Sequence, residues 1–221
     1  MKSQQSGFTL VEIAIVLVII GLLLGGILKG QELINSAKVK SLANDFRTIP
    51  TYIYAYQDKF KSLPGDDNNI AGHLGGTATQ ATTGGSIGNG VIEGNWWSST
   101  ATDESFLFWQ HVRLSNLAPG PTAAADANYW PTNAMGGVIG MNSASATAAQ
   151  VTGMTGTYQI CSTGILGKFV KQLDIQMDDG DTATGSLRAT ANVTSTTFAQ
   201  SAPVATAAVD DATSYTVCQT F

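Results

Sequence analysis

The residues most suggestive of enzymatic chemistry lie in a glycine-rich stretch at positions 84–88. The sequence Gly-Gly-Ser-Ile-Gly fits the G-x-S-x-G pattern, in which Ser86 would be a hydrolase nucleophile. That pattern requires a strand before the serine and a helix after it, and the flanking residues are too poor in apolar side chains to form either. Of the two histidines, His73 and His111, the second falls on a short helix expected from about Asp103, where we interpret it as a structural residue. We therefore predict that the chain is not an enzyme.

An acidic turn is the one candidate for metal chemistry. Asp174, Asp178, Asp179 and Asp181 surround Gly180. Carboxylate oxygens on a turn are ligands that calcium prefers. The spacing is not that of an EF-hand loop, so calcium binding is one interpretation and a hydrated acidic turn is the other. No other cofactor is expected.

The chain has two cysteines, Cys161 and Cys218, both in its last third. If this part of the chain is exported, it meets an oxidising compartment, in which a disulfide is the expected state. Two unconnected buried thiols are the alternative. We predict the disulfide.

Three tryptophans, Trp96, Trp97 and Trp130, fall in segments that we expect to be loops. Exposed aromatic side chains mark contacts with other subunits or with carbohydrate. In a loop-rich domain, however, such side chains commonly form the core. We favour the core interpretation.

The longest apolar segment, residues 8–28, contains one ionisable side chain, Glu12. As a helix it would reach about 30 Å, the thickness of the hydrocarbon core of a membrane. Its residues are apolar all round, whereas a buried helix of a soluble protein has one apolar stripe. An ionised side chain in the bilayer centre costs roughly 2.5–3.5 kcal/mol. We therefore expect Glu12 to have a partner, and we find none in the segment, because residues 13–28 carry no charge.

Three kinds of targeting segment account for this pattern to different degrees. A secretory signal has only about 7–15 apolar residues and a small-residue cleavage site, which the following residues 29–38 do not offer. A single-span anchor explains the length of the segment but leaves Glu12 unexplained. Cleavage between Gly7 and Phe8 explains both, because it creates an ammonium group four residues from Glu12. That group can neutralise a carboxylate of its own chain or of a neighbour.

At these positions the sequence resembles the N-terminus of type IV pilins and type II secretion pseudopilins. Those families have a short basic leader ending in Gly, then Phe, with Glu as the fifth residue of the mature chain. Gly7, Phe8 and Glu12 occupy these places, and Lys2 supplies the charge of the leader. The resemblance covers about the first 30 residues.

The resemblance implies that prepilin peptidase cleaves the precursor after Gly7 and N-methylates Phe8. It also implies an inner-membrane assembly platform that draws the chain into a homo-oligomeric helical filament. The protein would span the bacterial inner membrane once before assembly and be periplasmic or extracellular afterwards. In the filament the terminal amine of an adjacent subunit would neutralise Glu12, so we expect Glu12 to set the register. The alternatives are a pseudopilin of type II secretion, a minor or tip pilin, and a membrane-tethered binding protein that does not polymerise.

Glycines occupy the part of the apolar segment where many type IV pilins carry a proline. Glycine costs about 1 kcal/mol relative to alanine in a helix, so the Gly25-Gly26 pair is a predicted weak point. Gly21 and Gly25, and Gly26 and Gly30, also have the small-xxx-small spacing of close helix contacts. Glycine is in any case common in membrane helices, which is the simpler explanation.

Helical periodicity continues beyond the membrane-length segment. The pattern predicts one helix from about Thr9 to Tyr56 or slightly beyond, and Pro64-Gly65 should end it. Pro50 should bend this helix or interrupt its hydrogen bonding locally. Its second half, residues 29–61, should be amphipathic and pack one stripe on the distal domain. The stripe comprises Leu33, Ile34, Ala37, Leu42, Phe46, Ile49 and Ile53.

The distal part is loop-rich and acidic. Residues 1–61 have a net charge of +3 and residues 62–221 of −8. This balance argues against a nucleic-acid partner, which requires a basic face. Near the C-terminus, strands are predicted at residues 156–161, 186–190 and 214–221, and a helix at residues 165–173.

The predicted fold class is therefore α+β, with a long N-terminal helix on a small antiparallel sheet, similar to a pilin. The expected regions are a leader (1–7), a transmembrane segment (8–28), an amphipathic helical segment (29–61) and a loop-rich globular domain (62–221).

Overall fold

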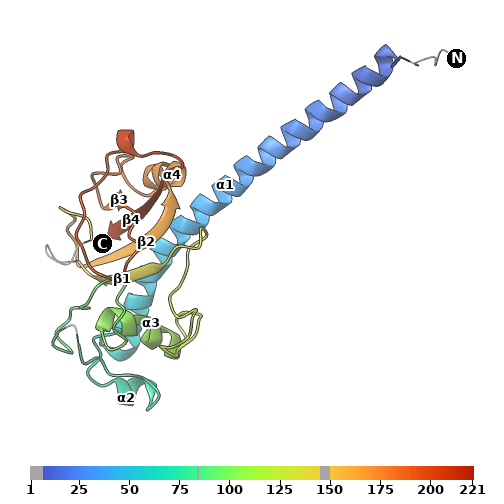
Figure 1. Cartoon of the computed structure of the whole chain (residues 1–221). Helices are drawn as coiled ribbons and strands as arrows, with labels where there is room; N and C mark the ends of the chain where they lie inside the picture. Colours follow the sequence, from blue (N-terminus) through green and yellow to red (C-terminus); the bar gives the residue numbers. More distant parts are fainter. Residues whose placement is uncertain (1–6, 84, 145–149) are drawn as a thin grey trace. The chain divides into compact units, whose positions relative to one another are not determined.

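The computed structural model describes residues 7–83, 85–144 and 150–221. Its elements, in chain order, are α1 (Leu10–Phe60), α2 (Ile70–Leu74), α3 (Glu104–Leu114), β1 (Ile139–Ser143), β2 (Tyr158–Leu166), α4 (Gly167–Met177), β3 (Leu187–Ala191), the 3-10 helix η1 (Thr206–Ala208) and β4 (Ser214–Thr220) (Figure 1). A long apolar N-terminal helix and a small antiparallel sheet make this an α+β fold, as the sequence predicted. The chain divides into two compact units, Met1–Lys38 and Val39–Phe221, and α1 contributes to both.

Helix α1 is 51 residues long and continues through Pro50. Proline removes one backbone donor, but the turns on either side are fixed because Phe46, Ile49 and Ile53 are buried. The helix ends at Phe60, before Pro64, and the next residue, Lys61, has a positive φ of 56°.

The buried stripe of α1 begins at Val39. From there to Ile53 its buried apolar side chains join one core cluster with residues of α3, α4 and the sheet. Leu33 and Ile34 are 62% and 58% exposed, so the prediction that the packed stripe begins with them was wrong. Both lie in the first unit, whose described part consists of α1 and the three residues before it, and no second element is present there to bury them.

The sheet has the strand order β1-β2-β4-β3, and all of its neighbours are antiparallel. Strands β2, β3 and β4 and helix α4 confirm the elements predicted near the C-terminus. Strand β1 was not predicted, because its sequence Ile-Gly-Met-Asn-Ser has few strand-forming residues. All five of its residues are buried, which shows that packing rather than local preference places it.

Two buried aspartates hold the loop that follows α1. The carboxylate of Asp66 accepts hydrogen bonds from the backbone N–H groups of residues 88–90. Asp67 accepts hydrogen bonds from Tyr56 Oη at 2.8 Å and from His73 Nδ1 at 2.6 Å. Burial acts to raise the pKa of Asp67, but these bonds hold it below its ordinary value. The two carboxyl groups thereby connect this loop to α1, to α2 and to residues 88–90.

Helix α3 is buried on almost every side, and His111 on it bridges two loops. Its Nδ1 accepts the N–H of Gly65, and its Nε2–H donates to the carbonyl of Thr79, both at 2.9 Å. Because one ring nitrogen accepts a hydrogen bond and the other donates one, the ring is assigned as neutral. Burial lowers the pKa of His111 to about 4, in agreement with a structural role.

The free energy of unfolding should therefore fall as the pH drops from about 6.5 to 4. In that range His111 takes up a proton in the unfolded chain but not in the folded chain, so acid favours unfolding by up to about 3 kcal/mol. His111→Gln keeps one acceptor and one donor and should flatten this part of the curve. Urea unfolding at several pH values measures the free energy of unfolding of both proteins. The other titrating groups are the same in the two proteins, so their contributions cancel in the difference. Equal slopes for the two proteins would contradict the assignment.

Candidate assembly site at the N-terminus of the long helix

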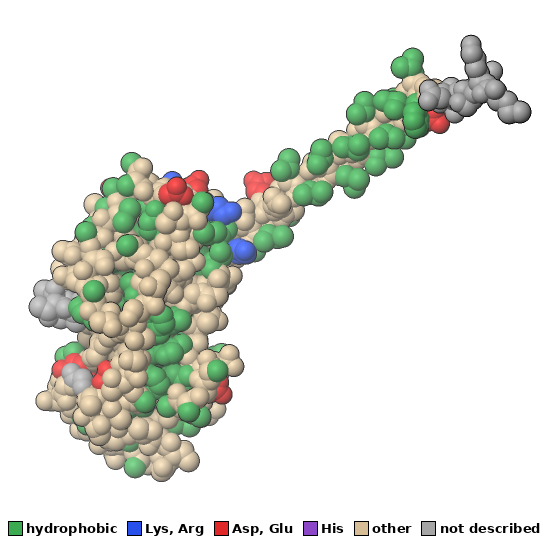
Figure 2. All heavy atoms as spheres, viewed as in Figure 1, with side chains coloured by type: hydrophobic (Ala, Val, Ile, Leu, Met, Phe, Trp, Pro, Cys, Tyr) green, Lys and Arg blue, Asp and Glu red, His purple; other side chains and the backbone are tan. Residues whose placement is uncertain are grey.

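The first half of α1 exposes apolar side chains in every direction. From residue 8 to residue 28 the large apolar side chains are 46% to 90% exposed. Figure 2 shows hydrophobic side chains along the whole visible length of this segment. Within the described residues, α1 is the one helix long and apolar enough to cross a membrane. An apolar surface of this extent requires lipid or other apolar helices around it.

Glu12 has a partner at the start of this helix, and that partner is Thr9. The backbone N–H and the hydroxyl of Thr9 donate to Glu12 Oε2 at 2.8 and 2.7 Å. In return, the N–H of Glu12 donates to Thr9 Oγ1 at 3.3 Å. This is a capping box, in which two side chains satisfy each other's backbone donors at a helix N-terminus. The carboxylate also lies at the positive end of the helix dipole, which favours its charge.

The expectation that Glu12 has no partner in its own segment was wrong, because Thr9 donates two hydrogen bonds to it. The missed signal was the pattern Thr-x-x-Glu directly before an apolar run, which is the sequence signature of a capping box. All contacts of the carboxylate go to Oε2. Within the described residues Oε1 of Glu12 makes no hydrogen bond, and it can accept one from another donor.

The Gly7–Phe8 bond lies just outside the helix. Residues 7–9 precede α1 and form no regular element, and Phe8 is 83% exposed. An exposed bond outside regular structure is accessible to a peptidase. Lys2 and the other leader residues up to position 6 lie outside the described residues.

Helix α1 is continuous through its four glycines, including the Gly25-Gly26 pair. A Cβ atom added at Gly21, Gly25, Gly26 or Gly30 would meet no atom within 4 Å. Among the described residues, nothing beyond the helix's own backbone covers these positions, so another helix can approach them closely.

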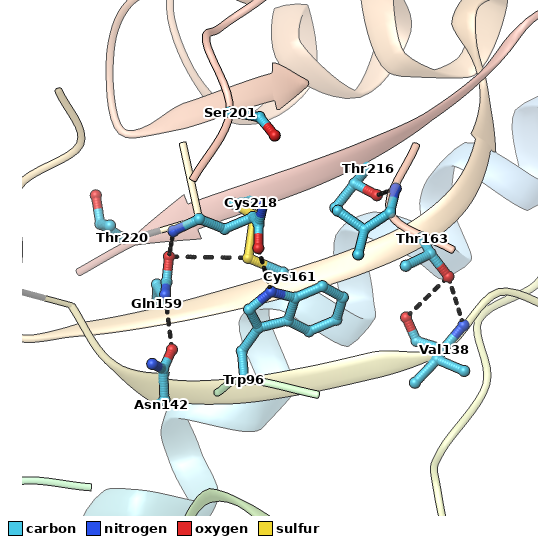
Figure 3. Close-up of a disulfide and its surroundings, with 12 residues drawn as sticks. Trp96, Val138, Asn142, Gln159, Cys161, Thr163, Ser201, Thr216, Cys218 and Thr220 are labelled. Atoms are coloured by element: carbon cyan, nitrogen blue, oxygen red, sulfur yellow. Dashed lines mark hydrogen bonds between the residues drawn. A yellow bond between two sulfur atoms is a disulfide. The ribbon is translucent and has the colours of Figure 1, made fainter. Parts of the chain in front are cut away.

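The predicted disulfide is present, and it joins Cys161 on β2 to Cys218 on β4. The two residues are direct partners in the register of these strands, with Cα atoms 4.1 Å apart. Both are fully buried in a small second core cluster with Trp96 (Figure 3). The indole N–H of Trp96 donates to Gln150 Oε1 at 2.8 Å. The bridge therefore lies inside the fold rather than on its surface.

The three tryptophans divide between core and surface. Trp96 is fully buried, which agrees with the core interpretation. Trp97 and Trp130 are partly buried and pack against the two core clusters, and Trp130 meets the ring of Phe106 edge-on at 5.5 Å.

The four aspartates proposed for calcium are engaged mainly with the backbone. Asp174 is buried and Asp178 is partly buried, and they accept the N–H groups of Gly180 and Leu187, both at 2.7 Å. Asp179 and Asp181 are exposed and accept N–H groups of their own turn. Burial raises the pKa of Asp174 to about 6, with a further contribution from the neighbouring carboxylates. No group of three or more His, Cys, Asp or Glu side chains in the described ranges could hold a metal ion, so the geometry gives calcium no support.

The apparent nucleophile motif lacks its context. Gly84 lies outside the described residues, and Ser86 is exposed in a stretch of bends and turns. His73 is bound to Asp67 and His111 to two backbone groups.

Comparison with known proteins identifies the N-terminal segment. The family of the prokaryotic N-terminal methylation motif matches residues 2–28. No curated protein and no solved structure matches the chain. The match covers the Gly7–Phe8 bond, the capping box of Thr9 and Glu12, and the apolar helix. The chain therefore begins with the class III leader and methylation motif of type IV pilins and pseudopilins, and this motif leads into its transmembrane-length helix.

Proposed function

We propose that this protein is a non-enzymatic structural subunit of a type IV pilus or a related filament. Prepilin peptidase cleaves it after Gly7 and N-methylates Phe8. An inner-membrane platform then transfers it from the membrane into a homo-oligomeric helical filament in the periplasm or outside the cell. The observation that carries the proposal is a lone carboxylate, Glu12, held at the start of an exposed, all-apolar helix directly after the cleavage position.

The physical reason for polymerisation lies in the apolar half of α1. In the membrane, lipid covers this surface, and in a filament the same surfaces of neighbouring helices cover one another. A charge that enters such an apolar bundle must be neutralised. The capping box leaves Oε1 of Glu12 open, and the new ammonium of Phe8 on an adjacent subunit supplies the cation. A subunit in the wrong register would leave both charges unpaired, so the pair selects one register.

Mass spectrometry of sheared filaments tests the proposal. We expect the protein to be recovered in the filament fraction with Phe8 as its N-terminus, carrying one methyl group on the amine. Cells lacking the prepilin peptidase are the matched control and should retain the full-length chain in the membrane. An intact leader in normal cells, or a protein found only in the membrane, would support a non-polymerising tethered binding protein instead.

A pseudopilin or a minor pilin is the second candidate. It is favoured by the extent of irregular structure in the second unit, where long loops separate α2 from α3 and α3 from β1. Such loops commonly carry specific binding functions. Quantifying the protein against the other subunits of the filament decides the matter, because a major pilin would dominate the preparation.

A further inference from the structure

A cavity of about 180 Å³ opens beside the second half of α1, within the unit formed by residues 39–221. Its walls come from α1, α3 and the loops before β1. Ile49, Pro119 and Pro131 give it an apolar lining, and Asp45 and Tyr52 supply polar groups. Its size suits one long side chain rather than a large ligand.

Asp45 in this cavity is a partly buried carboxylate that has no partner among the described residues. It forms no hydrogen bond and no ion pair with any residue in the described part of the chain, and burial raises its pKa to about 6. The cation lining the same cavity, Arg113, donates to the carbonyls of Pro119, Pro121 and Tyr129 at 2.7 to 3.2 Å. Asp45 is therefore the carboxylate of this cavity, and within the described residues it is free to accept a donor from outside the chain.

The opposite face of α1 carries the complementary charge. Lys40 and Arg47 are two helical turns apart on that face, and both are exposed. Neither has an ion pair or hydrogen bond with the described residues. The remaining basic side chains of this unit are engaged with carboxylates, carbonyls or aromatic rings; they are Lys59, Lys61, Arg113, Lys168, Lys171 and Arg188.

We infer that the cavity receives Arg47 of a second copy of this chain and that Asp45 pairs with its guanidinium group. The aliphatic part of an arginine fits an apolar lining, while its planar head matches a carboxylate. Arginine is also enriched at protein interfaces, whereas lysine is depleted, which favours Arg47 over Lys40.

The arrangement is heterologous, because the two partners lie on different faces of the same helix. Contacts of this kind do not close into a dimer, and they propagate into rings or open helical polymers. The inference thus rests on the proposed function and adds to it a second contact, outside the membrane-derived bundle.

Cross-linking between two differently marked copies tests the inference directly. One copy carries Asp45→Cys and the other Arg47→Cys, and both are expressed in the same cells. The native cysteines are joined in a disulfide, so the introduced thiols are the free ones among the described residues. A short bis-maleimide added to sheared filaments should give a cross-linked dimer from the mixed cells and little from cells with either variant alone. Lys40→Cys in place of Arg47→Cys is the matched control and should cross-link far less.

Charge reversal provides a readout independent of cysteine chemistry. Arg47→Glu should lower filament yield roughly tenfold, Lys40→Glu much less, and Asp45→Lys combined with Arg47→Glu should restore it. Filaments with methylated Phe8 that show neither the cross-link nor the rescue would overturn this inference and leave the proposed function standing. Cells in which the wild-type chain forms no filaments would overturn both.

Discussion

Replacing Glu12 by alanine is expected to leave the chain inserted in the membrane and cleaved after Gly7, but to abolish ordered filaments. Removing the carboxylate leaves the amine of the neighbouring Phe8 unpaired in an apolar bundle, a penalty of about 3–5 kcal/mol for each subunit. Insertion should not suffer, because the substitution makes the segment more apolar. Electron microscopy of sheared filaments, with immunoblots of membrane fractions, measures the two properties separately.

Two roles of Glu12 can be tested separately. One is its part in the capping box with Thr9, and the other is its proposed pairing with the amine of Phe8 on a neighbouring subunit. Thr9→Val removes the hydroxyl of the capping box and retains the carboxylate, so it should weaken the first helical turn by about 1 kcal/mol and permit assembly. Glu12→Gln retains a hydrogen-bond acceptor without charge and should fail to assemble. Glu32→Ala is the matched control, because Glu32 is exposed on the same helix and paired with Lys29. Normal filaments from Glu12→Ala would refute the proposal that the charge pair of Glu12 and Phe8 sets the register of the subunits.

Removing the disulfide should have the largest effect on the stability of the second unit. In Cys161→Ala/Cys218→Ala the unfolded chain gains the freedom of a loop with a sequence separation of 57 residues. The chain-entropy relation gives a loss of about 4 kcal/mol in the free energy of unfolding. Alanine is the appropriate replacement because both sites are fully buried and a serine hydroxyl would have to be desolvated there.

Urea unfolding of the full chain in detergent, followed by tryptophan fluorescence, measures this loss. The buried Trp96 lies beside the bridge and serves as the reporter (Figure 3). Wild-type protein treated with a reductant under unfolding conditions and then refolded should show the same midpoint as the variant. A loss below about 1 kcal/mol would show that strand pairing alone specifies this part of the fold.

The N-terminal assembly site was predictable because its determinants are local. An apolar run, a glycine before a phenylalanine and a carboxylate at a fixed spacing act through neighbouring residues along one helix. The Thr9–Glu12 pair was predictable too, since a capping box depends on four consecutive residues. The disulfide followed from there being only two cysteines, once export was inferred.

Elements with strong local patterns were also predictable. Strands β2, β3 and β4 and helix α4 form where alternating or helical periodicity indicates them. Strand β1 has no such pattern, and it exists because β2 offers a hydrogen-bonding edge and the core covers its side chains. A strand of this kind depends on contacts that are distant in sequence, and local propensity does not report them.

By itself, then, the sequence determined the membrane-length helix, the N-terminal methylation motif and the covalent bridge, because each depends on adjacent residues or on the cysteine count. The tertiary structure alone decided which aspartate side chains have hydrogen-bond partners. It engaged Asp66, Asp67 and Asp174 with backbone and side-chain donors, whereas Asp45 lines a cavity and has no partner among the described residues. The sequence shows these carboxylates as equivalent acids. Their difference arises because the pairing of a charge depends on which groups the fold brings within hydrogen-bonding distance.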